Sequence, residues 1–267
     1  MNRNPVVAGT FYPSSKATLE GMLAKLFAGA NKDDFGLVVS PHAGYEYSGK
    51  TAAHAINSLK PAKSFIVLGP NHSSIGAEFS IMTSGEWETP LGGVKIDSSL
   101  AGELNKCGIL DEDVIAHAHE HSIEVQLPFL QHRFKNFGLV PISIINTDYS
   151  GEFLESCALL GKMIAKTIEG RPIGVIASSD FSHYLPSKVA DEKDSKAIKK
   201  IIALDAKGLF KTLEGMDASV CGFAPIAVVM AAAKALGLKA KVIDHSNSGD
   251  ATGDYSSVVS YYAIGFK

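Results

Sequence analysis

Three apolar segments of the chain end abruptly in side chains that can bind a metal or transfer a proton. Each segment is short and rich in Val, Ile and Leu, and each is soon followed by a histidine. Such runs predict strands buried on both faces of a sheet. Because ligands bind beyond the carboxyl ends of the strands in open α/β sheets, we expect the three ends to form one site. The segments are Phe35–Ser40 before His42, Ser64–Leu68 before His72, and Pro172–Ala177 before Asp180 and His183.

Helical and strand patterns alternate along the rest of the chain, which predicts an α/β fold. Strands separated by helices favour a central sheet, predominantly parallel or mixed, that is covered by helices on both faces. No repeat, low-complexity tract or linker marks a boundary, so we expect a single domain over residues 1–267. The predicted helices are Ser15–Ala28, Thr51–Leu59, Leu100–Cys107, Ile123–Leu130, Phe153–Ile168, Lys193–Leu213 (one or two helices) and Pro225–Leu236; further strands are expected at Leu139–Ile145, Lys241–Ile243 and Ser257–Phe266, and a hairpin between Phe79 and Ile96.

Composition and charge favour a small-molecule or peptide ligand over a nucleic acid or a membrane. The chain has 267 residues, of which 46% are hydrophobic, and a formal net charge of -3 with acids and bases interspersed. No basic surface is therefore expected. No apolar run approaches the roughly 18 residues of a membrane span, and the N-terminus lacks a secretory signal pattern. We expect a cytoplasmic protein, in which the scattered Cys107, Cys157 and Cys221 form no disulfide framework.

His42 and His72 are the first candidates for metal ligands. Each follows proline, or proline and asparagine, at a predicted strand end. Two imidazoles suit iron, copper, zinc or nickel, and a third ligand would leave positions open for a substrate. The alternative is that each histidine is structural, which is common for a single histidine but harder to accept for two at matching strand ends.

Asp180 and His183 lie within one turn beyond the third predicted strand. We expect His183 to act as a general acid or base, because the pKa of histidine lies near neutrality, with Asp180 orienting or charging it. The alternative is that Asp180 or Ser182 caps the following segment. Ser178 or Ser179 together with Asp180 and His183 also matches the composition of a hydrolase triad, but the chain has no G-x-S-x-G motif.

Three alternate histidines and one cysteine complete the candidates. His117 and His119 flank an acidic region, and we expect both to be solvated. His121 and Glu124 are three residues apart on one predicted helical face, which we expect to face a cleft. Cys221 directly precedes a helical pattern, where the helix amides lower the pKa of a thiol, so we expect it to be a thiolate ligand.

The segment Gly44–Thr51 fits the phosphate-binding pattern G-x-x-x-x-G-K-[ST] and lies between a predicted strand and a predicted helix. Glu46 inside the pattern would repel the phosphates of a nucleotide. The aspartate that a magnesium ion needs would have to be Asp180 or Asp244. Nucleotide binding is therefore the weaker hypothesis, and we expect this match to be incidental.

Several motifs in fixed order resemble the Memo family over nearly the whole chain. They are Ala8–Pro13, Pro41–Gly49, Gly69–His72, Glu120–Glu124, Ser178–His183 and Cys221–Gly222. The Memo family is similar in fold to the class III extradiol dioxygenases, whose iron is held by two histidines and a carboxylate.

The resemblance implies a role for each of the candidate residues. His42 and His72 take the places of the two histidine ligands, and Cys221 takes that of the carboxylate. His183 matches the catalytic base of the dioxygenases, with Asp180 beside it. A thiolate changes the charge and the redox potential of such a site, so extradiol cleavage does not follow from the fold. We expect Fe(II), with copper or zinc as the alternatives.

The resemblance also bears on ligands and partners. Animal members are regarded as signalling adaptors whose pocket is associated with phosphotyrosine peptides and with an aromatic residue of the N-terminal arm, a tryptophan in those proteins and Phe11 here. We expect Phe11, Tyr45, His121 and Glu124 to contact the ligand. Microbial members occur alongside an AMMECR-type protein and a radical SAM protein, which are therefore candidate partners.

The leading hypothesis is a metal-binding, dioxygenase-like oxidoreductase that acts on an unidentified small molecule. One alternative is a module that binds a peptide or small ligand in the same cleft without turnover. Another is a metal-dependent hydrolase, which would use zinc and be indifferent to oxygen.

Overall fold

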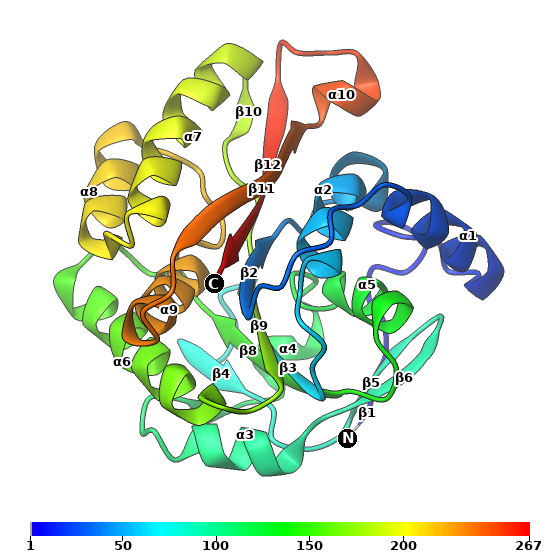
Figure 1. Cartoon of the computed structure of the whole chain (residues 1–267), viewed down its shortest axis with the longest axis vertical. Helices are drawn as coiled ribbons and strands as arrows, with labels where there is room; N and C mark the ends of the chain where they lie inside the picture. Colours follow the sequence, from blue (N-terminus) through cyan, green and yellow to red (C-terminus); the bar gives the residue numbers. More distant parts are fainter. Residues whose placement is uncertain (1) are drawn as a thin grey trace.

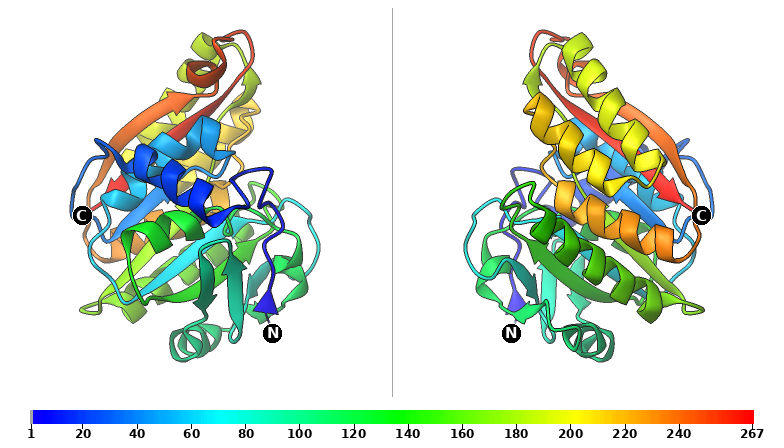
Figure 2. Two further views of the ribbon diagram at one scale, coloured as in Figure 1. Left: turned by 90° about the vertical axis from the view of Figure 1, so that its right-hand side faces the viewer. Right: turned by 90° about the vertical axis from the view of Figure 1, so that its left-hand side faces the viewer.

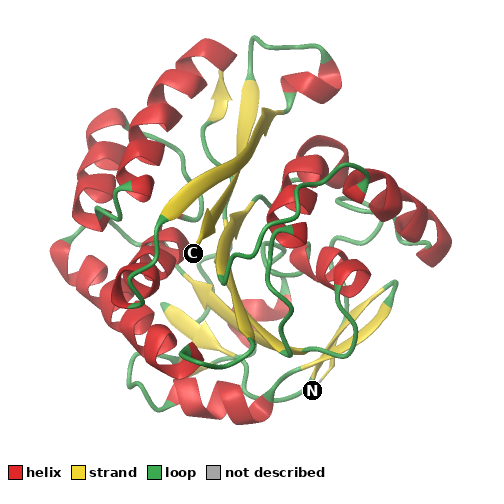
Figure 3. Ribbon diagram, in the orientation of Figure 1, coloured by secondary structure: helices red, strands yellow, loops and turns green. Residues whose placement is uncertain are grey.

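Four parallel strands form the centre of the sheet in the structure, a computed structural model that describes residues 2–267. They lie in the order β2 (Leu37–Ser40), β9 (Ile173–Ser178), β3 (Ser64–Pro70) and β8 (Gly138–Ile144). An antiparallel strand pairs with each side of this group, so the sheet is mixed. The predicted α/β fold is confirmed (Figures 1 and 3).

The other strands extend this sheet or form a small second one. The main sheet runs β10-β12-β2-β9-β3-β8-β4-β7, with β11 paired to β12, and the second sheet runs β1-β5-β6. The remaining strands are β1 (Asn2–Arg3), β4 (Phe79–Ile81), β5 (Glu86–Thr89), β6 (Gly92–Lys95), β7 (Asp111–Glu112), β10 (His183–Leu185), β11 (Ala240–Asn247) and β12 (Val258–Phe266).

Helices cover both faces of the sheet, as predicted. Figure 1 shows α1, α2 and α5 on one side of the central strands and α6 and α9 on the other. No helix in residues 2–267 is long and apolar enough to cross a membrane. The helices are α1 (Lys16–Phe27), α2 (Tyr45–Asn57), α3 (Ser98–Asn105), α4 (Ile115–Ala118), α5 (Gln126–Arg133), α6 (Gly151–Ile168), α7 (Ser187–Ile202), α8 (Ala206–Met216), α9 (Phe223–Ala235) and α10 (Gly249–Thr252).

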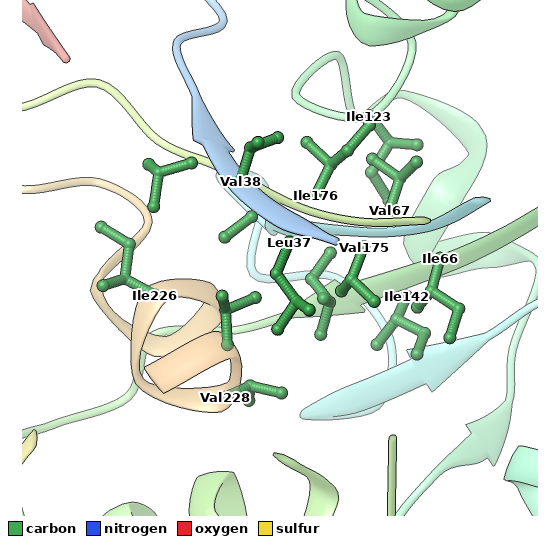
Figure 4. Close-up of a cluster of buried hydrophobic side chains, with 14 of the residues drawn as sticks. Leu37, Val38, Ile66, Val67, Ile123, Ile142, Val175, Ile176, Ile226 and Val228 are labelled. Atoms are coloured by element: carbon green, nitrogen blue, oxygen red, sulfur yellow. The ribbon is translucent and has the colours of Figure 1, made fainter. Parts of the chain in front are cut away.

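Side chains of the central strands alternate between two apolar layers (Figure 4). Leu37 and Val175 point toward α9, where Ile226 is also buried, whereas Val38 and Ile176 point to the opposite layer. Successive residues of a strand face opposite sides of the sheet, so a strand covered on both sides must be apolar at every position. This explains why these strands could be recognised as unbroken apolar runs.

The helix after β2 begins at Tyr45, earlier than the predicted start at Thr51. The Gly44–Thr51 segment is therefore helical and not a loop. Its amides are used within the helix, as the bond from the Ser48 N–H to the Gly44 carbonyl (3.1 Å) shows. A helical segment cannot wrap successive amides around a phosphate, so the phosphate-loop reading of this motif is wrong.

Strand β11 is also longer than predicted. It pairs with β12 over Ala240–Asn247, whereas the sequence indicated only Lys241–Ile243. The register shifts between Val242 and Asp244, and a bulge of this kind interrupts the alternation that identifies a strand. The long β11–β12 hairpin carries α10 at its end, next to α2 (Figure 1).

We expect Ile176→Ala, in the centre of β9, to lower the free energy of unfolding by about 2–5 kcal/mol, because it removes a fully buried side chain and leaves a cavity. Ile115→Ala is the control, since Ile115 is 63% exposed and its loss should change stability by less than about 0.5 kcal/mol. Urea denaturation of both variants measures the difference. Equal midpoints would contradict the buried position of β9.

Candidate functional site

His42 lies two residues beyond β2, at the edge of the sheet where the parallel strands end. Its side chain is 2% exposed, and its backbone N–H donates to the Asp180 carboxylate at 2.8 Å. Burial, together with the nearby imidazoles of His72 and His121, holds the pKa of His42 well below its usual range. The ring is therefore neutral, as an imidazole ligand of a metal must be.

The hydrogen bonds around Ser178 decide which ring nitrogen of His42 carries the proton. Ser178 Oγ donates its one hydrogen to the Ser122 carbonyl at 2.7 Å. The side-chain amide of Gln126 donates to Ser178 Oγ as well, and to the Pro41 carbonyl, which fixes its orientation. Ser178 has no further hydrogen, so His42 Nδ1 must donate to it across the 2.9 Å contact. His42 Nε2 is left with a free lone pair.

His72 follows β3, and Glu120 orients it. The Glu120 carboxylate accepts the backbone N–H of His72 at 2.6 Å and lies 3.1 Å from Nδ1. Because a carboxylate only accepts, Nδ1 keeps a proton, and Nε2 is the nitrogen that could bind a metal. Burial acts to lower the pKa of His72, but the hydrogen bond to Glu120 and its charge outweigh burial and raise the pKa. Burial likewise opposes the charge of Glu120, yet the bond from His72 holds its pKa well below the usual range.

Cys221 reaches the site from the turn before α9. Its Sγ lies 3.2 Å from His42 Nε2 and accepts the backbone N–H of Asp180 at 3.1 Å. The prediction that the helix end lowers the pKa of this thiol is wrong: burial raises the pKa of Cys221 well above its usual range, and the Asp180 carboxylate adds to the effect. A thiolate at this position therefore requires a cation beside it.

The ligand atoms of His42, His72 and Cys221 lie within 4.8 Å of one another. At usual bond lengths to a transition metal, nitrogen and sulfur ligands are about 3.1 Å apart at a right angle and about 3.6 Å apart at a tetrahedral angle. The 3.2 Å between His42 Nε2 and Cys221 Sγ falls in this range. The fold thus brings the three predicted ligands to one point, in an arrangement that a single metal ion fits.

Two glycines permit the close approaches that build this point. A Cβ on Gly69 in β3 would collide with Ser122 and Ile123, which belong to the turn that carries Glu120. A Cβ on Gly222 would collide with the carbonyl of Ser178 at the end of β9. Both turns can therefore lie directly against strand ends only because these residues have no side chain.

Asp180 and His183 border the three candidate ligands. Burial raises the pKa of Asp180 to about 6, against the opposing effect of the His42 N–H. His183 donates from Nδ1 to the Ser219 carbonyl at 2.7 Å, and its backbone N–H donates to Ser219 Oγ. This leaves Nε2 of His183 as the nitrogen that can accept a proton.

The serine hydrolase triad is not formed. Ser178 Oγ is fully engaged by the network around His42, and Ser179 Oγ donates to the Asp180 carbonyl at 2.8 Å. Both serines are fully buried. In the described chain neither hydroxyl hydrogen-bonds to His183, so no serine is positioned as a nucleophile with a histidine base.

A cavity of about 530 Å³ opens beside these residues. His42, His72, Asp180 and His183 line it, so these four sequence-predicted groups face a common space, whereas Cys221 is not part of the lining. His121 also lines the cavity: its ring stacks on His72 with centroids 4.8 Å apart and meets the ring of His42 edge-on at 5.5 Å. Phe11 covers His121, with ring centroids 4.8 Å apart, and lines the cavity from the N-terminal arm.

Glu124 and Tyr45, which we expected to contact a ligand, point elsewhere. Glu124 is fully buried and binds the N-terminal arm: it pairs with Arg3 at 2.7 Å and accepts the Tyr12 hydroxyl at 2.6 Å and the backbone N–H groups of Val6 and Val7. Tyr45 is buried, and its hydroxyl donates to a backbone carbonyl of the Glu124 turn. Within the described residues, neither side chain lines the cavity that His42 and His72 share.

The arm is thereby connected to the candidate ligands. Arg3, which stacks on Trp87 at 4.1 Å, also donates to the carbonyls of Glu120 and His117. Figure 2 shows the arm running from β1 toward α1 past the β5–β6 hairpin. Glu124 thus holds the arm that carries Phe11, and Arg3 holds the turn whose Glu120 orients His72.

His117 is buried rather than solvated as predicted, whereas His119 is exposed. The side chain of His117 packs against Trp87, with ring centroids 5.8 Å apart, inside the region closed by Arg3. Burial, with a smaller contribution from the Arg3 guanidinium, lowers the pKa of His117 to about 4. Its alternation with His119 and His121 gave no sign of this difference, which arises because Arg3 and Trp87 enclose only the first of the three.

Four residues that orient the candidate ligands were not assigned that role from the sequence. Ser178 and Gln126 set the protonation of His42, Glu120 orients His72, and Asn146, just after β8, donates to the Cys221 carbonyl. The position of Asn146 after a strand end was a usable signal. Gln126 lies in an ordinary helical pattern, and nothing in the sequence distinguishes it.

Comparison with known proteins agrees with this geometry. The family model described as Memo-like protein matches residues 3–265. The chain belongs to the Memo family. A MEMO1 family protein of Methanopyrus kandleri is 41% identical over 100% of this chain and 99% of its own length, and one of Saccharolobus solfataricus is 42% identical over the same shares.

A solved structure supports the fold alone. An uncharacterized protein from Escherichia coli K12 superposes with a TM-score of 0.55 over 85% of this chain and 99% of its own, at 12% sequence identity. The Memo fold of the chain, with its mixed sheet, is consistent with the resemblance to extradiol dioxygenases.

Glu124→Gln should destabilise the protein by about 3 kcal/mol or more, because it leaves the Arg3 charge buried without its partner. It should also expose residues 2–13 to limited proteolysis. The matched control is Glu103→Gln, whose partner Arg171 lies at 2.8 Å in a half-exposed pair that contributes less than about 1 kcal/mol. Equal urea midpoints for the two variants would contradict the role of Glu124 as anchor of the arm.

The stability of the protein should fall in acid partly because of His117. Since the folded state holds the pKa of His117 at about 4, below its ordinary 6.5, protons bind the unfolded chain first as the pH falls. His117→Phe should therefore reduce the loss of unfolding free energy between pH 7 and pH 5 by about 2 kcal/mol. Urea titrations of both proteins at the two pH values give this difference, and an identical loss in both would refute it.

Proposed function

We propose that this Memo protein holds one transition metal ion through His42, His72 and Cys221 and acts on a small organic molecule bound in the adjoining cavity. The observation that carries the proposal is that both histidines are held through Nδ1, which leaves Nε2 as the nitrogen that can bind a metal beside the thiol of Cys221. Their Nδ1–H groups donate hydrogen bonds to Ser178 and Glu120. Such outer partners are the usual means of orienting imidazole ligands.

The donor set favours a redox-active metal. Two imidazoles and one anionic ligand with open positions are typical of non-haem iron sites, and a thiolate also suits copper or zinc. Fe(II) is the metal that we propose, and when bound it would supply an open coordination position for substrate or oxygen. The chain contributes a hydrogen bond from the Asp180 N–H to Cys221 Sγ, which stabilises negative charge on sulfur.

The ligand atoms of a second group, His72, Glu120 and His121, also lie within 4.8 Å of one another. It is the poorer site, because the Glu120 carboxylate already accepts from His72 Nδ1 and from the backbone N–H groups of His72 and Ser122. A metal bound there would break the bonds that orient His72. His121 is therefore proposed as a wall of the cavity and not as a ligand.

Proton transfer is assigned to His183 and Asp180. His183 can accept a proton at Nε2 while its Nδ1–H stays on the Ser219 carbonyl, so the ring need not turn during the reaction. Asp180, with its pKa raised to about 6, can change protonation near neutral pH beside His42 and Cys221. These two groups would move protons for a substrate lying between them.

Metal analysis tests the proposal. Protein purified without oxygen should contain about one equivalent of metal, and His42→Ala combined with Cys221→Ser should remove it, since two of three ligands are lost. His183→Ala should keep the metal, because His183 is not a ligand, and should lower any turnover. Full metal content in the double variant would exclude the assigned ligands. Stable zinc and indifference to oxygen would favour a hydrolase instead.

A further inference from the structure

The cavity has a second wall that the proposed metal centre does not use. It consists of Phe11 in the arm, Tyr47 in α2, Tyr184 in β10, and Tyr261 and Asp254 in and before β12, a set that we call the outer wall. These residues come from four separate parts of the chain. Four of them carry an aromatic ring, and Asp254 carries a carboxylate.

The tyrosines of the outer wall, Tyr47, Tyr184 and Tyr261, line the same cavity. Burial raises the pKa of the Tyr261 hydroxyl, and Asp180, Tyr47 and Tyr184 lie close enough to raise it further. Tyr261 is buried, but Tyr47 and Tyr184 are 43% and 79% exposed and so stand at the mouth of the cavity. Tyr184 has a φ of 57°, in the left-handed region that residues with a Cβ rarely adopt, and its ring lies 6.0 Å from that of His183.

Among the described residues, the ionisable acids and bases that line the cavity, apart from its histidines, are all acids. Asp180 and Asp254 line it, and an adjoining cavity of about 220 Å³, which shares Phe11, Gly44 and Tyr47, adds Glu46. Among the described residues, no lysine or arginine lines either cavity. Two hydrogen bonds from Ser256 hold Oδ1 of Asp254, which leaves Oδ2 available to a ligand.

Aromatic faces combined with carboxylates are the usual means by which proteins bind organic ammonium groups. Each ring face attracts a cation through its quadrupole, and a cleft lined by acids concentrates cations at its entrance. The same wall disfavours a carboxylate or a phosphate, because it offers no positive side chain to balance it.

We propose that the outer wall binds the ammonium group of an amine-bearing substrate whose other end lies at His42, His72 and Cys221. This inference rests on the proposed function only for the position of that other end. It assigns the substrate class, an organic amine, and makes phosphorylated peptides and other anions poor ligands of the outer wall.

Three probes of nearly equal size test the charge preference. Tyramine, 4-(2-hydroxyethyl)phenol and 4-hydroxyphenylacetate carry a positive, a neutral and a negative group on the same phenol. Calorimetry on the metal-free full-length protein should give tyramine an affinity about three- to tenfold higher than the neutral probe, with the anion weakest. Equal affinities, a preference for the anion, or no binding of tyramine at millimolar concentration would overturn the proposal.

Substitutions in the outer wall and at Glu46 test whether these residues cause the preference for tyramine. Asp254→Asn combined with Glu46→Gln should bring the ratio of tyramine to neutral-probe affinity close to one, and Tyr184→Leu should lower it while Tyr184→Phe preserves it. Asp111→Asn, which removes an exposed acid in β7 outside both cavities, is the control and should leave the ratio unchanged. A ratio that survives loss of Asp254 and Glu46 would refute the outer wall as its source. Because these measurements need no metal, they stand apart from failure of the metal assignment.

Discussion

Parallel pairing of β2, β9 and β3 is the constraint on which the candidate site depends. It aligns Ser40 with Ser178 and Leu68 with Ala177, so the three strands end together at one edge. The chain must turn away from the sheet at the end of each strand. The first polar residues after these turns are therefore brought close to one another. Apolar layers on both sides of the sheet hold this alignment, because a slip of one residue would exchange the two buried faces.

Two polar residues buried just below that edge, Ser178 and Glu120, orient the histidines so that defined nitrogen atoms can bind a metal. Ser178 belongs to β9, yet its hydroxyl accepts a hydrogen bond from His42, which follows β2. The same hydroxyl donates a hydrogen bond to the carbonyl of Ser122, in the turn after α4. The Glu120 carboxylate accepts the Nδ1–H of His72 in the same way and donates nothing. Because Nδ1 of each imidazole donates to a fixed acceptor, both rings are oriented, with Nε2 as the remaining metal-binding nitrogen, before any ion binds.

The N-terminal arm shows how far the site extends beyond the strands. Residues after β1 form little regular structure, and they are held by the buried Glu124 and by Arg3 on Trp87. The arm delivers Phe11 to the cavity and seals His117 into the interior. A short irregular segment is thus part of the site because two buried charges neutralise each other beneath it.

Much of this could be predicted from residue patterns. Unbroken apolar runs identify β2, β3 and β9, and the histidines that follow them, with Asp180, mark the edge where they meet. Local patterns failed where distant segments decide the outcome: Cys221 has a raised pKa because other elements bury it, and Glu124 faces the arm instead of a ligand. The sequence by itself determined the central strands and which metal-capable groups follow them, since burial on two faces demands apolar residues throughout. Only the tertiary structure decided the protonation of those groups and which of them face the cavity, because both depend on hydrogen bonds and burial contributed by residues far away in the chain.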